Sequence, residues 1–417
     1  MMKIKLIIIL LFISAALPAQ TYRTRAISPE IYTILVKGNG EWDKQPIIIQ
    51  NSGDFVNISF DRISEDSFNR LRYKILFCNA DWTPNKELSD MEYLDGFNDN
   101  PIDDYAGSIN TTVNYTHFNL DIPNRDINLK LSGNYLVVVY EEDNPDNILL
   151  TACFSVIDPK TSIMSQVSSV TDIDANKEHQ QVAFSIQHQL QMRDPVTELK
   201  VFVRQNNRLD NQRTNFKPSM ITPNKISYEH IRDLIFEAGN EYRRFETSTY
   251  RANGLNVAHI EYQRPYYLMD ITTDNIKTGR SYSYDQDQNG QFIIRNRESD
   301  LGDTEADYFL IRFTLAMDEP IFQNIYINGD FTNNTFDEKY LMKYNNDTRS
   351  YNLTLLLKQG LYNYQYLAQM KGKYSTSAIE GNYYNTENRY DILVYYRPVG
   401  QRYDSLVGIS ALYSRKK

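Results

Sequence analysis

Apolar and polar residues alternate with a period of two along most of the chain. In the run Phe55–Phe60, Val56, Ile58 and Phe60 lie on one face, while Phe55, Asn57 and Ser59 lie on the other. This alternation is typical of a half-buried antiparallel strand. Turn formers such as Ser132-Gly133-Asn134 separate the runs. The pattern therefore predicts an all-β protein rather than a helical one.

The spacing of these strands and turns predicts tandem β-sandwich domains. We predict strands at 32–37, 46–49, 55–60, 73–77, 112–120, 135–140 and 149–157, a spacing typical of an immunoglobulin-like sandwich. A second set of strands begins near residue 171 and a third near residue 325. We expect a leader at residues 1–19, an N-terminal sandwich at 20–160, a middle sandwich at 161–316 and a C-terminal sandwich at 317–417.

The first residues resemble a secretory signal peptide. Lys3 and Lys5 precede the apolar run Leu6–Ala16, and small or neutral residues stand before Gln20. The run is short for a bilayer span, so an uncleaved membrane anchor is the less favoured alternative. No later run is long and apolar enough to predict a transmembrane helix. We expect an exported protein without a transmembrane segment.

The charge balance bears on the choice of partner. The 417 residues include 44 Lys and Arg against 53 Asp and Glu, a net charge of −9, which becomes −11 once Lys3 and Lys5 are removed with the leader. An acidic chain is a poor ligand for nucleic acid or anionic lipid. Two cysteines, Cys78 and Cys153, can form one disulfide in an exported protein, and two buried thiols are the alternative.

No sequence motif indicates catalysis, and we expect no enzyme activity and no cofactor. The chain has no G-x-S-x-G motif, no phosphate-binding glycine loop and no C-x-x-C pair. The aromatic segment between residues 77 and 140 carries acids that a carboxylate-pair mechanism would need, but acids in turns are usually solvated. These acids are Asp99, Asp103 and Asp104. The five histidines are scattered, at 117, 179, 188, 230 and 259.

One loop partly matches a calcium-binding pattern. Asp285, Asp287, Asn289 and Gly290 follow the first half of a calcium loop, but Asn296 stands where the pattern requires glutamate. Asn289-Gly290 between two alternating runs also predicts a β-hairpin joining residues 282–284 to 292–295. We favour the hairpin and expect no metal site.

The last hundred residues resemble early-immunoglobulin-like modules related to starch- and glycogen-binding domains. The resemblance rests on two runs, IYINGDFTN at residues 325–333 and GLYNYQY at residues 360–366. Asn334, Thr335 and Phe336 stand where the family places its sugar-stacking tryptophan. The resemblance implies the fold of the module, and a periplasmic glycan-binding protein is the alternative function.

The first domain resembles the first domain of the type IX secretion system plug proteins of Bacteroidota. Several motifs occur in one order over about 60 residues: Cys78-Asn79-Ala80-Asp81-Trp82, Glu92-Tyr93-Leu94-Asp95-Gly96-Phe97, Asp104-Tyr105, Ser108-x-Asn110-Thr111, Tyr115-Thr116-His117 and Ser132-Gly133-Asn134-Tyr135. The resemblance implies a periplasmic protein that docks on the giant outer-membrane β-barrel translocon and seals its periplasmic opening. It implies no catalytic residues and no small-molecule substrate.

Four aromatic residues within these motifs are candidates for contact with the translocon. They are Trp82, Tyr93, Phe97 and Tyr105. Aromatic anchors surrounded by polar residues are common at protein interfaces. The alternative is that these rings are buried and hold the first sandwich together.

Overall fold

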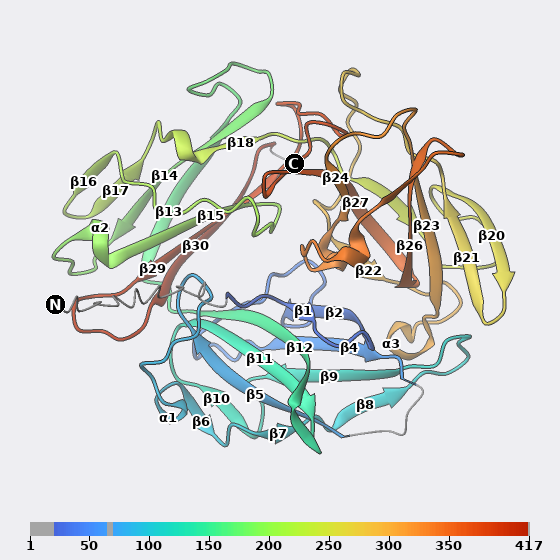
Figure 1. Ribbon diagram of the computed structural model, residues 1–417. Helices are drawn as coiled ribbons and strands as arrows, with labels where there is room; N and C mark the ends of the chain where they lie inside the picture. Colours follow the sequence, from blue (N-terminus) through green and yellow to red (C-terminus); the bar gives the residue numbers. More distant parts are fainter. Residues whose placement is uncertain (1–20, 65–69, 416–417) are drawn as a thin grey trace, which may run out of the picture.

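The computed structural model describes residues 21–64 and 70–415 as three two-sheet units arranged around a common centre (Figure 1). The all-β prediction is confirmed, while an immunoglobulin-like topology stays a prediction. The expected leader, residues 1–19, lies outside the described residues. Within the described chain, no helix has both the length and the apolar character needed to cross a membrane.

The first unit packs a four-stranded sheet against part of a larger one. The smaller sheet has the order β2-β4-β9-β8 (Ile31–Gly38, Val56–Arg62, Thr116–Ile122, Asp104–Gly107). The larger sheet contributes β1 (Arg25–Ala26), β3 (Ile47–Ile49), β5 (Leu71–Cys78), β7 (Asn100–Pro101), β11 (Gly133–Glu141) and β12 (Asn144–Ile157). A short helix and a two-stranded ribbon lie beside it: α1 (Asp90–Tyr93), β6 (Leu94–Gly96) and β10 (Ile127–Leu129). The alternating residues Val56, Ile58 and Phe60 are fully buried between the sheets.

The middle unit is assembled from two separated segments of the chain. One sheet and two short helices come from β13 (Thr161–Ser168), β14 (His179–His188), α2 (Pro195–Glu198), β16 (Met220–Thr222), β17 (Lys225–Tyr228), a 3-10 turn (Arg232–Leu234) and β18 (Ile235–Glu237). The facing strands are β15 (Leu199–Gln205), β29 (Arg389–Tyr396) and β30 (Ser405–Tyr413). Because β29 pairs with β15 along its whole length, the last strands of the chain complete this unit.

The third unit lies between these two segments in sequence. One sheet has the order β20-β21-β23-β26-β25 (Val257–Gln263, Tyr266–Ile271, Tyr308–Ala316, Ser350–Lys358, Lys343–Asn345). The facing strands are β19 (Arg243–Glu246), β22 (Phe292–Ile294), β24 (Asn324–Asn328), β27 (Gly360–Met370) and β28 (Lys373–Ser375). Short helical turns occur at α3 (Gly302–Glu305), Asp330–Thr332 and Glu338–Tyr340.

The strand pairing corrects the expected boundary between residues 316 and 317. β23 on one side of that boundary pairs with β26 on the other, and the strands expected to close the C-terminal domain belong to the middle unit. The first unit ends with β12 at Ile157, and β13 of the middle unit begins at Thr161. Local alternation predicts strands but not their partners, which are chosen by long-range packing of the two sheets.

The predicted hairpin at Asn289-Gly290 is wrong. Residues 282–284 form no strand, and β22 pairs with β27 instead of folding back on them. The carboxylate of Asp287 accepts hydrogen bonds from the backbone N–H groups of Tyr242 and Asn289, which turns the chain toward β27. The turn signal was correct, but the element that precedes it is a loop.

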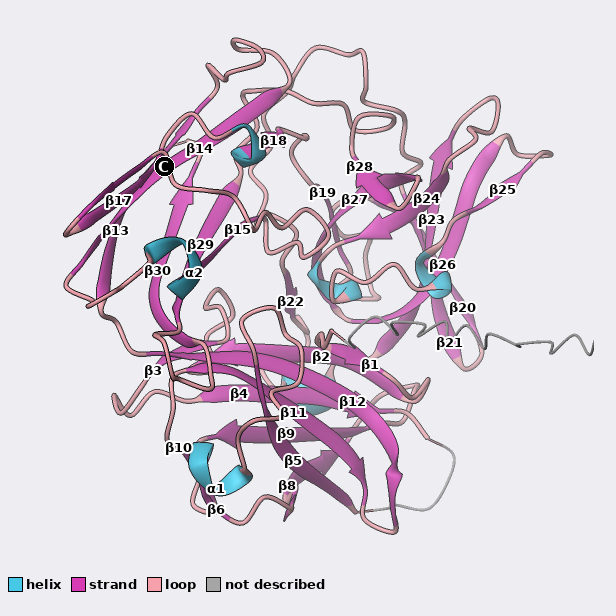
Figure 2. Ribbon diagram, turned by 60° about the vertical axis from the view of Figure 1, so that its left-hand side comes forward, coloured by secondary structure: helices cyan, strands magenta, loops and turns pink. Residues whose placement is uncertain are grey.

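The first and middle units share one continuous sheet. Parallel pairing of Ile157 with Leu406 joins β12 to β30, so the order among the described strands is β15-β29-β30-β12-β11-β5-β7. Figure 2 shows β12 and β30 meeting where the two units touch. A sheet that passes through both units holds them in a fixed relative position.

Candidate functional site

The turn at residues 79–82 covers the outer face of β11. Trp82 has a φ of +63°, its N–H donates to the Asn79 carbonyl at 2.9 Å, and its own carbonyl accepts from Tyr22 N–H at 2.9 Å. The Trp82 side chain is only 7% exposed and packs with Cys78, Leu136 and Val138. Trp82 is therefore a packing residue of the first unit and is withdrawn as a contact residue.

The side chain of Asn134 links the same turn to the middle unit by hydrogen bonds. The Asn134 amide is fully buried, and its Nδ2 donates to the Asn79 carbonyl at 3.0 Å. Its Oδ1 accepts from Ser155 Oγ and from Tyr395 Oη, both at 2.8 Å. Tyr395 belongs to β29, so this hydrogen bond crosses between the two units. The two sequence motifs at 78–82 and 132–135 thus meet at one joint.

A buried carboxylate completes this joint. Asp404 accepts from Ala80 N–H at 2.9 Å and from Lys200 Nζ at 3.0 Å. Ala80 packs with Phe202, Tyr395 and other apolar residues of the middle unit. A larger side chain at position 80 would enter this packed interface, so the alanine of the motif has a structural reason.

Tyr93 also lies inside the first unit. The side chain is 3% exposed and its ring lies 5.6 Å from Phe77, measured between ring centroids. Its hydroxyl donates to Asp90 Oδ1 at 2.6 Å, and burial raises the pKa of the phenol well above its ordinary value. Tyr93 is likewise withdrawn as a contact residue, because it is not accessible to a partner.

A second joint connects the first unit to the third. Asp61 in β4 is fully buried and accepts from Tyr308 Oη at 2.6 Å and from Lys358 Nζ at 2.7 Å. His117 Nδ1 lies 2.6 Å from the other carboxylate oxygen. Tyr115 donates its hydroxyl to the Ala306 carbonyl at 2.7 Å. The sequence motif at 115–117 therefore meets the third unit at a buried ion pair.

The other two aromatic candidates are exposed. Phe97 is 72% exposed after β6, and Tyr105 in β8 is 44% exposed. Met91 in α1 is 80% exposed. Figures 1 and 2 both place β6 and β8 on the side of the first unit that lies opposite the middle and third units. We call Met91, Phe97 and Tyr105 the distal aromatic face.

The comparison with protein families bears directly on these motifs. Residues 31–158, from the first residue of β2 to the residue after β12, match the family model described as the type 9 secretion system plug protein first domain. The chain carries the first domain of the type IX secretion system plug family. The role that this name describes, a plug, is not enzymatic. The predicted resemblance is thereby confirmed.

A solved structure is similar to almost the whole plug-family chain. It is the crystal structure of a hypothetical protein from Parabacteroides merdae ATCC 43184 at 2.30 Å resolution. The two are 45% identical, the match covers 94% of this chain and 100% of the other, and the TM-score is 0.92. The similarity therefore extends beyond the first unit to all three. No curated protein matches the chain.

The two cysteines of the plug-family chain are free, which agrees with the alternative of two separate thiols and not with the possible disulfide. Cys78 in β5 and Cys153 in β12 lie on opposite sides of β11, opposite Asn134 and Leu136 respectively. Two strand spacings are about 10 Å, beyond the Cα separation of about 7 Å that a disulfide tolerates. Burial raises the pKa of the Cys78 thiol to about 12, with a smaller contribution from Asp81.

The candidate carboxylates are engaged in separate contacts. Asp99 pairs with Arg72 at 2.6 Å and accepts from Tyr140 Oη at 2.6 Å. Burial opposes ionisation of Asp99, but these two hydrogen bonds outweigh it and lower its pKa. Asp103 and Asp104 are exposed and contact Arg125 and Asn119. The three acids do not converge on one cleft.

The calcium alternative and the histidines give no metal site. Asp285 pairs with Arg244, while Asp287 uses both oxygens on backbone N–H groups. His179 and His230 each contact a different aspartate. Throughout residues 21–64 and 70–415, no three His, Cys, Asp or Glu side chains are grouped as metal ligands.

The C-terminal motif residues are core residues of the third unit. Tyr362, Tyr364 and Tyr366 are each at most 1% exposed, and Asp274 accepts from the hydroxyls of the last two. Rings in this position cannot stack on a sugar. The alternative of glycan binding through this motif therefore has no exposed platform.

Sequence reasoning missed the partners that complete both joints. Tyr395, Asp404, Tyr308 and Lys358 lie more than 200 residues from the atoms they contact in the first unit. Their own neighbourhoods look like ordinary strands. The only signal was the position of Asn134 and Asp61 directly beside strand-like runs, where a polar residue that becomes buried requires a partner.

Proposed function

We propose that the protein is a periplasmic plug that docks on the outer-membrane translocon barrel of the type IX secretion system and seals its periplasmic opening. The match of residues 31–158 to the plug family model carries this proposal. The signal-peptide pattern at the start of the sequence supports an envelope location, since it predicts export.

The joints between the units support a sealing role. A stopper must keep its shape against the pore, and a preformed surface loses little conformational entropy on binding. The shared sheet and the buried contacts of Asn134 and Asp61 fix the first unit to both others. The plug would therefore dock as one body rather than as three linked domains.

We propose the distal aromatic face as the contact surface. It combines Phe97, Tyr105 and Met91 with the exposed acids Asp95, Asp103 and Asp104 nearby in sequence. An apolar anchor with a charged rim is the usual composition of a protein interface. The face lies opposite the other two units, so it can meet a barrel without disturbing the joints (Figure 2).

Docking is tested by recovering the tagged protein from detergent-solubilised outer membranes of the native host. We expect a large β-barrel protein to be recovered with it. An untagged strain controls for non-specific recovery. A well-folded plug that recovers no barrel contradicts docking.

Sealing needs a separate test. We expect cells that lack the protein to admit a hydrophilic probe too large for ordinary porins, and the wild-type gene to restore exclusion. Docking without any change in permeability would contradict sealing while leaving the docking proposal intact.

A further inference from the structure

A cavity of about 150 Å³ lies where the three units meet. Its walls come from residues 22–24, β2, β3 and β12 of the first unit, from β15 and Leu393 of the middle unit, and from β22 and residues 330, 333 and 334 of the third. A cavity of this size has room for a molecule as large as benzene. No motif or contact described above accounts for it.

The cavity is positively charged although the chain is acidic. Four cations line it, namely Arg23, Lys37, Lys44 and Arg204, against the single carboxylate of Asp330. Lys44 pairs with Glu41 at the surface. The chain as a whole has 53 acids against 44 bases, so the excess of cations here is opposite to the average composition.

The other three cations are not in direct contact with a carboxylate of the described chain; Asp391 and Asp330 act on Arg204 and Lys37 only from beyond 4 Å. Arg204 donates its Nε to Gln212 at 2.6 Å, which leaves its terminal nitrogens available, and no ion pair within 4 Å involves Arg23, Lys37 or Arg204. Burial lowers the pKa of Lys37, although Asp330 and Asp43 oppose this effect. Desolvated cations that lack a counter-ion are costly, so an anion from solution would stabilise them.

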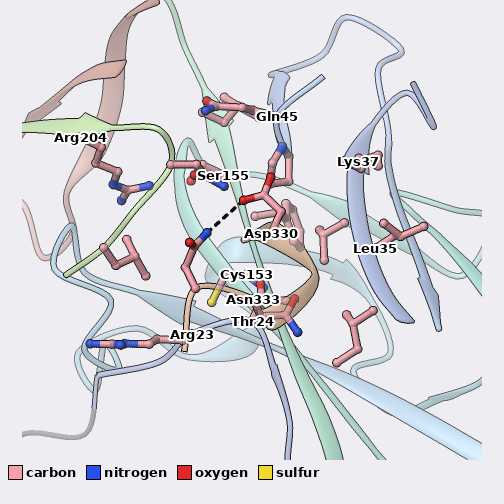
Figure 3. A pocket seen from close by; sticks show the side chains of 18 of the residues that line it. Arg23, Thr24, Leu35, Lys37, Gln45, Cys153, Ser155, Arg204, Asp330 and Asn333 are labelled. Atoms are coloured by element: carbon pink, nitrogen blue, oxygen red, sulfur yellow. Dashed lines mark hydrogen bonds between the residues drawn. The ribbon is translucent and has the colours of Figure 1, made fainter. Parts of the chain in front are cut away.

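The cations come from opposite sides of the cavity. Figure 3 shows Arg204 and Arg23 on one wall, Lys37 on the opposite wall and Asp330 between them. Asp330 accepts from Asn334 at 3.0 Å. A neutral donor is also present, since the Asn333 amide lines the same space.

We propose that this cavity binds a small oxyanion, of the size of a phosphate or a short carboxylate. Guanidinium groups match the paired oxygens of phosphate and carboxylate, and an ammonium group adds a point charge. The ligand would contact Arg23 and Lys37 of the first unit, Arg204 of the middle unit and Asn333 of the third. Because it contacts all three, binding stabilises their arrangement and raises the unfolding temperature.

In the test, the full protein is titrated with inorganic phosphate, and binding is monitored by calorimetry and by thermal unfolding. Chloride at the same ionic strength is the control. We expect saturable binding and a rise in the unfolding temperature. A parallel titration with succinate separates a phosphate site from a carboxylate site, and saturable binding of either supports the proposal. No saturable binding of either anion overturns it.

Variants assign the binding to the cavity. Arg204→Gln and Lys37→Gln should each weaken binding by about tenfold or more, since each removes hydrogen bonds to a charged ligand. Arg25→Gln is the matched control: it removes the same charge from an exposed position in β1 that does not line the cavity, and should bind like wild type. If Arg204→Gln misfolds, Lys37→Gln alone still tests whether the anion binds in the cavity. Equal weakening in the control and the cavity variants overturns the assignment.

Discussion

The Tyr395 hydroxyl donates a hydrogen bond to Oδ1 of Asn134 across 2.8 Å, although 261 residues separate the two in sequence. Asn134 belongs to a plug-family motif of the first unit, and Tyr395 belongs to the last segment of the chain. The motif therefore contributes to a joint between units as well as to its own sandwich. These two residues therefore stabilise the relative position of the first and middle units.

Tyr395→Phe tests this joint by removing one hydroxyl. We expect the free energy of unfolding to fall by about 1–2 kcal/mol, because a buried hydrogen bond is lost while Ser155 still donates to Asn134. Denaturant unfolding measures the change. Tyr262→Phe, at a position 51% exposed, is the control and should change stability by less than about 0.5 kcal/mol. Equal effects in the two variants would contradict a special role for Tyr395.

The ion pair between Asp61 and Lys358 should be much more sensitive. Both side chains are at most 1% exposed, and burial lowers the pKa of Lys358 despite the opposing effect of Asp61. Lys358→Met leaves a buried carboxylate without its cation, so we expect a loss of about 3–5 kcal/mol in denaturant unfolding.

Two further variants test this interpretation of the ion pair. Asp61→Asn combined with Lys358→Met should recover part of the loss, because no unpaired charge remains. Lys343→Met, at an exposed position in β25, should be nearly neutral. If the double variant were as unstable as the sum of the two single ones, the pairing would not be the cause.

The β-strand character of the first unit could be predicted from sequence because its signals are local. Val56, Ile58 and Phe60 alternate and are buried as the alternation requires. The pairing of β15 with β29 could not be predicted, since the sequence of a strand does not specify the distant strand with which it pairs. The burial of Trp82 was equally hidden, because it depends on the outer face of β11 being covered. Sequence alone left both burial and exposure open for such aromatic residues.

Asp287 should make stability depend on pH. Burial raises its pKa to about 7, with Glu241 adding to the effect and the Asn289 and Tyr242 hydrogen bonds opposing it. The folded state therefore binds this proton more tightly than the unfolded state. The stabilising contribution is complete below the unfolded value near 3.8 and is lost as pH rises to about 7.

Comparison with Asp287→Asn isolates this contribution. The stability of wild type relative to the variant should fall as pH rises from 4 to 7, by at most about 4 kcal/mol at about 1.4 kcal/mol per pKa unit. Unfolding free energies at several pH values measure it. Asp347→Asn, at an exposed position, serves as the reference for a general charge effect. A difference that stays flat over this range would contradict the raised pKa.

The thiols should be free and slow to react. Denatured without reductant, the protein should release two titratable thiols per chain, since Cys78 and Cys153 are unpaired. The native protein should react slowly with a thiol reagent, because burial raises the pKa of both thiols and little thiolate is present. Finding no titratable thiol in the denatured, unreduced protein would show instead that the two are joined.

Phe97→Asp should weaken recovery of the translocon barrel without unfolding the plug. Phe97 is 72% exposed, so its replacement costs little packing, while a charge in the centre of an apolar contact is strongly unfavourable. We expect at least about a tenfold loss of recovered barrel, with the circular dichroism spectrum and unfolding temperature unchanged. Phe322→Asp is the matched control, since Phe322 is 97% exposed in the third unit, away from the distal aromatic face. If Phe322→Asp abolished recovery and Phe97→Asp did not, the contact surface would lie on the third unit and the distal aromatic face would be free in the complex.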